Sequence, residues 1–182
     1  MKTVFIERSV GEGRGGDWSE SLDLDGVDRI VVGTGPGSFA GIRSALAFAQ
    51  GFALGSKCEV MGLPSPCAVA AQLYSGGTVF PLAVVGDARR GKFWVALFDG
   101  FRLACPVFQV DGEHLPLRVP LSAKVVTPDD VRIGDRLAET FGERYIGGAR
   151  PTADGLRAFA EACPSALVAE PLPIYLNPAV RD

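Results

Sequence analysis

Histidine is almost absent from this chain of 182 residues, which contains only His114. With one histidine, a three-histidine zinc site is impossible. A Ser-His-Asp triad would have to use His114, but no Gly-x-Ser-x-Gly segment accompanies it. We interpret His114 as a surface loop residue. No pair of carboxylates and no nucleophile stands out, so the sequence predicts neither a catalytic residue nor a metal site.

Cysteine is scarce and dispersed, at Cys58, Cys67, Cys105 and Cys163. No two of these are close enough in sequence to indicate a disulfide framework or a metal knuckle. They are typical of small buried residues in a reduced protein. The sequence also shows no N-terminal signal and no apolar run long enough to span a membrane. We therefore expect a cytoplasmic protein without membrane contact.

Positive charge is in deficit, with 18 lysines and arginines against 21 aspartates and glutamates, a net charge of −3. A negative chain is a poor stand-alone binder of nucleic acid or of a membrane surface. Any tRNA role would be indirect. The composition, 47% apolar and 21% charged, is ordinary for a globular protein. The length predicts one domain or two small lobes, with a boundary near residues 76–78.

Charged residues are rare between Ile30 and Gly86, where only Arg43, Lys57 and Glu59 occur. So long an uncharged segment indicates a core layer, and also a contact surface, because a small protein seldom hides it completely. The pattern alternates strand and helix, which predicts a parallel sheet. The expected elements are strands 2–8, 28–33 and 57–63, a helix over 39–54, and a second helix through residues 68–74.

The helix expected over Phe39–Leu54 is apolar on nearly all sides, and Ser38 is a natural N-cap. Only Arg43, Ser44 and Gln50 are polar in its body. Such a helix is either central or packed against another chain. The sequence alone does not decide which side chains face the core. The predicted partner contacts are Ser38, Phe39, Ile42, Arg43, Ala45, Leu46, Ala49 and Phe52.

The second half of the chain has short elements and a hairpin. Strands 79–86 and 92–99 flank the turn 87–91, and residues 101–110 supply a third antiparallel partner. The remaining expected elements are short strands 124–127, 131–133 and 144–147, helices 136–141 and 152–163, and an extended tail.

The loop Gly35-Pro-Gly-Ser-Phe-Ala40 lies between a strand and a helix, so its backbone amides could hold an anion. It formally fits the dinucleotide pattern Gly-x-Gly-x-x-Ala, with Glu59 as the ribose-binding acid. Against this, Pro36 lacks an amide hydrogen, and Glu59 falls early in its strand.

The turn Asp87-Ala-Arg-Arg-Gly91 places a carboxylate beside two guanidinium groups. It is either a polar hairpin turn capped by Asp87 or a clamp to the other lobe or to a partner. The predicted anion or inter-lobe contacts are Gly35, Gly37, Asp87, Arg89 and Arg90.

Three segments resemble a known family. Gly35-Pro-Gly-Ser-Phe-Ala-Gly-Ile-Arg43 is similar to the Gly-Pro-Gly-Ser-Phe-Thr-Gly-Ile/Leu-Arg signature of the TsaB (YeaZ) family. Asp87-Ala-Arg-Arg-Gly-Lys-Phe-Trp94 resembles its Asp-Ala-Arg-x-Gly-Glu-Val-Tyr hairpin, and Pro173-Ile-Tyr-Leu176 its Pro-x-Tyr-Leu-Arg ending. The three occur in the family's order.

The resemblance implies an α/β fold of the actin-like, Hsp70-like (ASKHA, ribonuclease H-like) type, with lobes at 1–77 and 78–182. It implies a non-catalytic scaffold that pairs with TsaD, and through that pair with the ATPase TsaE, in tRNA threonylcarbamoyladenosine synthesis. The older glycoprotease label is not supported. No cofactor is expected here, since ATP and metal belong to the partner subunits. In the family, the helix after the glycine loop packs on TsaD or on a second copy.

The chain also departs from the family pattern. It reaches the glycine loop after only 34 residues, which predicts a shortened N-terminus and a truncated first lobe without the usual phosphate-type turn. Ala40 replaces the motif threonine and Asn177 the tail arginine. Two alternatives therefore stay open: an actin-like domain with a residual nucleotide site, and a self-associating homologue without the tRNA-modification role.

Overall fold

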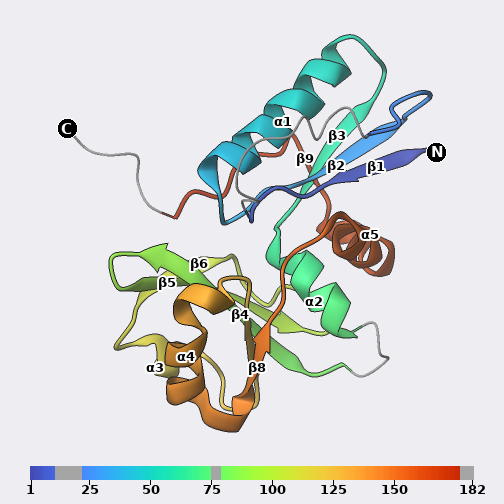
Figure 1. The fold of residues 1–182 in the computed structure, drawn as a ribbon. Coiled ribbons are helices and arrows are strands. Elements are labelled where there is room, and N and C mark those ends of the chain that lie inside the picture. Colours follow the sequence, from blue (N-terminus) through green and yellow to red (C-terminus); the bar gives the residue numbers. More distant parts are fainter. Residues whose placement is uncertain (11–21, 75–78, 177–182) are drawn as a thin grey trace.

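The computed structural model describes residues 1–10, 22–74 and 79–176. Within these residues the chain forms two β-sheets with helices on their faces (Figure 1). The strand order is β1-β2-β3-β9 in the first sheet and β6-β5-β4-β7-β8 in the second. The strands are β1 (Thr3–Ile6), β2 (Arg29–Gly33), β3 (Glu59–Leu63), β4 (Pro81–Arg89), β5 (Lys92–Asp99), β6 (Phe108–Asp111), β7 (Lys124–Thr127), β8 (Tyr145–Gly148) and β9 (Val168–Ala169). The helices are α1 (Phe39–Leu54), α2 (Pro66–Tyr74), α3 (Leu115–Arg118), α4 (Asp130–Phe141) and α5 (Ala153–Ala162), with 3₁₀ turns at Gly142–Arg144 and Pro164–Ala166.

The first sheet is built around β2, which pairs in parallel with β3, as predicted, and also in parallel with β1. Side chains alternate between the two faces of a strand. Ile30 and Val32 belong to the core cluster that includes the buried side of α1. Val31 belongs to the cluster on the other face, which includes α2 and α5. Both faces of β2 are therefore covered, which explains its continuous apolar run.

The second sheet is built around the predicted hairpin of β4 and β5. Arg90 and Gly91 form its two-residue turn, both with positive φ, 53° and 76°. Positive φ at both positions is the requirement of a type I′ turn, whose twist matches that of the flanking strands. β6 pairs antiparallel with β5, and β7 and β8 add to the other side in parallel.

The two sheets share one core. The cluster around α2 contains Val31 and Leu63 from the first sheet and Leu82 and Val84 from the second, together with Phe159 of α5. α2 lies between the sheets (Figure 1), and most of its residues are buried. Because α2 packs on both sides, it fixes the two sheets relative to each other.

The strand predicted at 131–133 is wrong, because these residues form the start of α4. Ile133, Leu137 and Phe141 are all buried. Their spacing of four residues places them on one helical face. Two β-branched residues, Val131 and Ile133, are a local pattern typical of a strand. The four-residue period of the longer segment instead favours the helix that forms.

The chain after residue 152 returns to the first sheet. α5 packs against α2 and β1, and β9 pairs antiparallel with β3. Beyond β9, the Ile174 amide donates to the Thr34 carbonyl at 2.9 Å. The division into 1–77 and 78–182 stays a prediction, and these contacts connect the end of its second part to the first lobe.

Candidate functional site

Helix α1 begins where the loop after β2 meets the end of β1. The Ser38 hydroxyl accepts a hydrogen bond from the Gly41 amide at 3.3 Å, so Ser38 is the N-cap, as predicted. The Ser38 amide in turn donates to the Ser9 carbonyl. A Cβ on Gly41 would overlap the Arg8 carbonyl, so only glycine lets the chain pass this close to the first turn.

One face of α1 packs on the core of this chain. Ile42, Ala45, Leu46 and Ala49 are at most 4% exposed and pack on β2. Four of the eight predicted partner contacts are therefore buried here, and their contact with a partner stays a prediction. Phe52 and Ser38 are half-buried. In so apolar a helix, hydrophobicity did not distinguish the core side from the free side.

The opposite face of α1 is exposed and nearly uncharged. Phe39 is 56% exposed and Leu54 91%. Arg43 is the only charged residue of the helix, and its guanidinium lies over the Phe39 ring, 5.0 Å from the centroid. The exposed positions are Phe39, Ala40, Arg43, Ser44, Ala47, Gln50, Gly51 and Leu54, hereafter the free face of α1.

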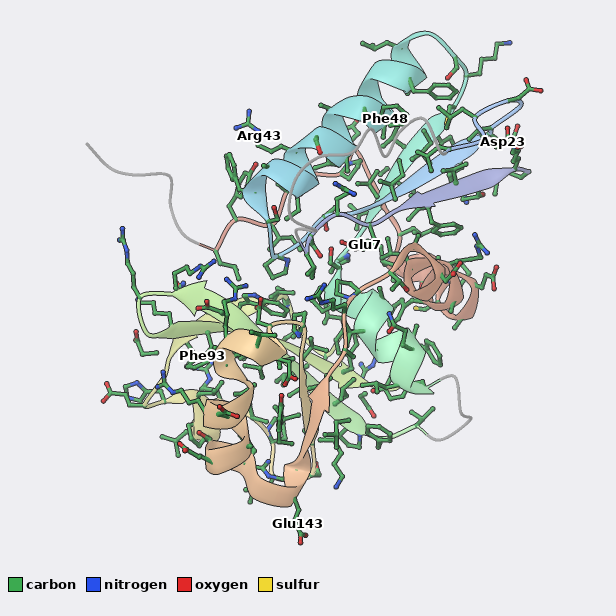
Figure 2. All side chains as sticks on the ribbon, viewed as in Figure 1. Glu7, Asp23, Arg43, Phe48, Phe93 and Glu143 are labelled. Atoms are coloured by element: carbon green, nitrogen blue, oxygen red, sulfur yellow. The ribbon has the colours of Figure 1, made fainter. Side chains whose placement is uncertain are left out.

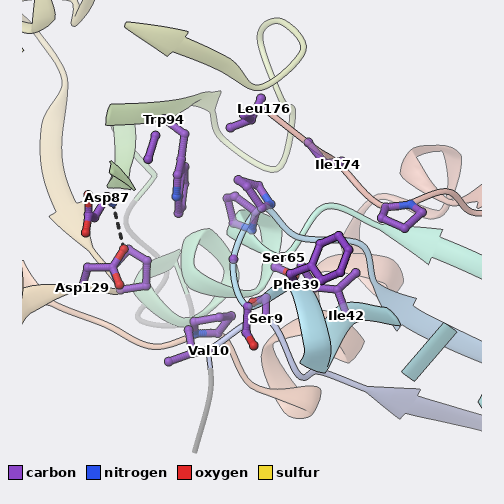
Figure 3. Close-up of a pocket in the computed structure, with 18 of the residues that line it drawn as sticks. Ser9, Val10, Phe39, Ile42, Ser65, Asp87, Trp94, Asp129, Ile174 and Leu176 are labelled. Carbon is purple, nitrogen blue, oxygen red and sulfur yellow. Dashed lines mark hydrogen bonds between the residues drawn. The ribbon is translucent and has the colours of Figure 1, made fainter. Parts of the chain in front are cut away.

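A cleft of about 1750 Å³ opens between the two sheets. The first lobe contributes Ser9, Val10, the loop 36–38 and one side of α1, with Phe39, Ile42, Arg43, Leu46, Ala47 and Gln50. The second contributes the end of β4, Trp94 and the residues before and within the first turn of α4 (Figure 3). The tail from Pro171 to Leu176 lines it as well. The predicted contacts Gly37, Asp87 and Arg89 all lie on this cleft.

Two predicted contacts lie elsewhere. Gly35 is buried beneath the cleft, where its amide donates to the Ser65 hydroxyl at 3.0 Å. Its amide is thereby used within the fold and does not face an anion. Arg90 is exposed in the β4–β5 turn and does not line the cleft.

Asp87 and Asp129 form a charged cluster on the wall of the second lobe. The Asp87 carboxylate lies 3.2 Å from Arg89 and 3.6 Å from Arg132, and Arg132 also pairs with Asp129. The Asp129 carboxylate accepts the Asp87 amide at 2.9 Å (Figure 3). Asp87 accepts the Arg89 amide, as expected of a polar hairpin turn, and its charge also joins the hairpin to Arg132 of α4 within the second lobe. A clamp to the other lobe or to a partner stays a prediction.

Sequence reasoning missed Glu7 and Ser9, which follow β1 (Figures 2 and 3). Ser9 lines the cleft. One Glu7 oxygen accepts the Ser9 amide at 2.6 Å. The other, Oε2, is buried, and neither it nor the Ser9 hydroxyl has a hydrogen-bond partner among the described residues. A Cβ on Gly33 would overlap this carboxyl group. The signal available in the sequence was a charge directly after an apolar strand.

Burial raises the pKa of Glu7 above its ordinary value of 4.5, and this outweighs the opposing hydrogen bond from Ser9. Between pH 4.5 and the folded pKa, the folded state therefore binds more protons than the unfolded state. The free energy of unfolding falls as pH rises through the folded pKa, and the loss is complete above it. We expect Glu7→Gln to remove this dependence and to raise the free energy of unfolding at neutral pH, because the amide stays neutral where the buried carboxylate is charged.

Urea unfolding of both proteins between pH 4 and 8 measures this difference. Glu161→Gln, at an exposed position of α5, is the matched control and leaves the pH dependence unchanged. Parallel pH profiles for wild type and Glu7→Gln would show that the buried carboxyl does not set the dependence.

Comparison with known proteins gives the relationship. The family model for TsaD, tRNA N6-adenosine threonylcarbamoyltransferase, matches residues 19–104. TsaB of Escherichia coli is 34% identical over 82 residues, 44% of this chain and 35% of that protein. An uncharacterized protein of Mycobacterium tuberculosis is 32% identical over 97 residues, 53% of this chain and 44% of that protein. The solved structure of YeaZ from Pseudomonas aeruginosa superimposes with a TM-score of 0.72 at 21% identity, over 95% of this chain and 99% of that one.

These similarities support the assignment of this chain to the TsaB/YeaZ family.

A second Pseudomonas aeruginosa structure, described as similar to peptidase YeaZ, gives a TM-score of 0.74 at 20% identity over 97% of this chain and 100% of that one. The predicted actin-like α/β fold is confirmed by these similarities. The chain matches less than half the length of the curated relatives named above. The predicted shortening of the first lobe stays a prediction.

No helix among the described residues is long and apolar enough to cross a membrane. Within the same residues, no three histidine, cysteine, aspartate or glutamate side chains gather as metal ligands would.

Proposed function

We propose that this chain is a non-catalytic scaffold subunit in tRNA threonylcarbamoyladenosine biosynthesis and pairs with a TsaD-type subunit. TsaB relatives in Escherichia coli and Haemophilus influenzae carry that pathway in their names. The partner would supply ATP and metal chemistry, TsaE would join through the TsaD pair, and tRNA contact would be indirect. A homodimer is the state proposed for the chain without its partner.

The observation that carries this proposal is the free face of α1. A helix of sixteen residues exposes one arginine and otherwise uncharged side chains to solvent. Small residues at Ala40, Ala47 and Gly51 leave room for a second helix to approach closely. Nothing within 4 Å would meet a Cβ at Gly51, so that part of the face is open. An apolar face of this kind marks a contact site for another chain.

The test is light scattering on a sizing column, with this chain alone and then mixed with TsaD from the same organism. We expect a one-to-one complex that elutes ahead of either component. A chain that stays separate from TsaD at micromolar concentrations would contradict the proposal. A homodimer that does not exchange with TsaD would instead support a self-associating homologue.

A further inference from the structure

We propose that the inter-lobe cleft is the second half of the partner site and receives an acidic, amphipathic helix of the protein that docks on α1. This inference rests on the function proposed above. It adds the second lobe to the interface and states the chemistry of the occupant.

The cleft and the free face of α1 are continuous. Arg43, Ala47 and Gln50 belong to the free face and also line the cleft, and Arg43 projects from α1 in Figure 2. A helix seated on α1 therefore faces the opposite wall, formed by the hairpin and by the start of α4. The volume of about 1750 Å³ exceeds the 300–1,000 Å³ typical of small-molecule sites. It suits a segment of a protein.

Exposed apolar side chains gather on this cleft. Phe39, Val131, Leu172 and Tyr175 are each at least 50% exposed, and all four line it. Val131, on the second lobe, is 95% exposed. The Phe39 and Tyr175 rings contact each other with their centroids 5.3 Å apart, so the tail extends the apolar surface beyond α1. An apolar partner face would cover these side chains.

The net charge of the residues that line the cleft is positive. Its arginines are Arg43, Arg89, Arg132 and Arg150, and its carboxylates are Asp87, Asp129 and Asp130. Arg89 and Arg132 are held by Asp87 and Asp129, and Asp130 accepts the Tyr145 hydroxyl. Arg43 and Arg150 have no ion pair within the described residues.

The N-termini of three helices add to the positive charge of the cleft. α1, α2 and α4 all begin at the cleft, and each N-terminus carries partial positive charge. Acidic side chains on the inserted helix would meet Arg43 from one wall and Arg150 from the other. RNA fits less well, because a phosphate backbone would leave the exposed apolar side chains of the cleft uncovered.

Charge reversal at Arg150 tests the inference, because Arg150 lies on the second lobe and outside α1. Affinity for TsaD is measured by titration calorimetry at 50 and 300 mM salt. We expect Arg150→Glu to weaken binding at least tenfold at low salt and to flatten its salt dependence, since the lost attraction is screened by salt. Arg90→Glu is the matched control, at an exposed arginine that does not line the cleft, and should change affinity less than twofold. Circular dichroism confirms that both variants are folded.

A photo-crosslinking residue at Val131 then identifies the occupant. We expect the cross-linked peptide to be an acidic segment of TsaD with an amphipathic helical pattern. Normal binding by Arg150→Glu, with binding lost in a variant of α1, would overturn the cleft inference and leave the proposed function standing. Failure of the wild-type chain to bind TsaD would overturn the proposed function itself. Cross-links to tRNA, or to a basic peptide, would also overturn the inference.

Discussion

Ala45→Glu is expected to destabilise the fold strongly. Ala45 is 0% exposed and lies in the cluster between α1 and β2. A carboxylate placed there would lie among the apolar side chains of that cluster and away from water. Leaving a charge unpaired in a core costs about 3–5 kcal/mol. That is much of the total stability of a domain, about 5–15 kcal/mol.

The measurement is urea unfolding followed by circular dichroism, with Ala47→Glu as the matched control. Ala47 lies two residues away on the free face of α1, so the same substitution on the same helix meets water. It should change stability by about 0.5 kcal/mol or less. Equal stability of the two variants would show that the α1 faces are assigned the wrong way round. Ala45→Glu is therefore unsuitable as a test of association, because a loss of binding could not be separated from a loss of folded protein.

Ala47→Glu is expected to abolish association with TsaD while the chain stays folded. Ala47 lies near the middle of the free face, between Arg43 and Gly51. A glutamate there fills the space that an approaching helix needs, and its charge would lose water against an apolar partner. At the centre of an interface, such changes cost about 2–4 kcal/mol. This corresponds to a loss of affinity of roughly 30- to 1,000-fold.

Calorimetry at 150 mM salt measures this loss. Ala158→Glu, at an exposed position of α5, introduces the same charge on another helix and should bind TsaD as the wild type does. Wild-type affinity for Ala47→Glu would remove α1 from the interface. Loss of affinity in both variants would indicate a general effect of net charge.

The local elements were largely predictable because their signals are local. The apolar run after Asp28 gives β2, Ser38 caps α1, and the period of the helix runs to Leu54. The hairpin followed from its turn residues. The prediction failed at residues 131–133, where three residues were too few to separate a strand from the first turn of an amphipathic helix.

The site was less predictable because it depends on which side chains meet. Gly37, Asp87 and Arg89 line the cleft, since loops that follow strands gather at sheet ends. Ser9 lines it as well, because β1 pairs in parallel with β2, which brings the end of β1 beside the start of α1. No spacing in the sequence indicates that pairing.

The sequence by itself determined the class of fold, the apolar character of α1 and the family resemblance, because composition, periodicity and motifs belong to neighbouring residues. Only the tertiary structure decided which face of α1 is free. Ala45 and Ala47 are identical in chemistry and adjacent in the pattern, and the sheet beneath the helix alone separates them. Among the described residues, the same packing leaves Arg43 and Arg150 as the cleft arginines without an ion pair, since Arg132 pairs with Asp87 and Asp129 only where α4 meets the hairpin.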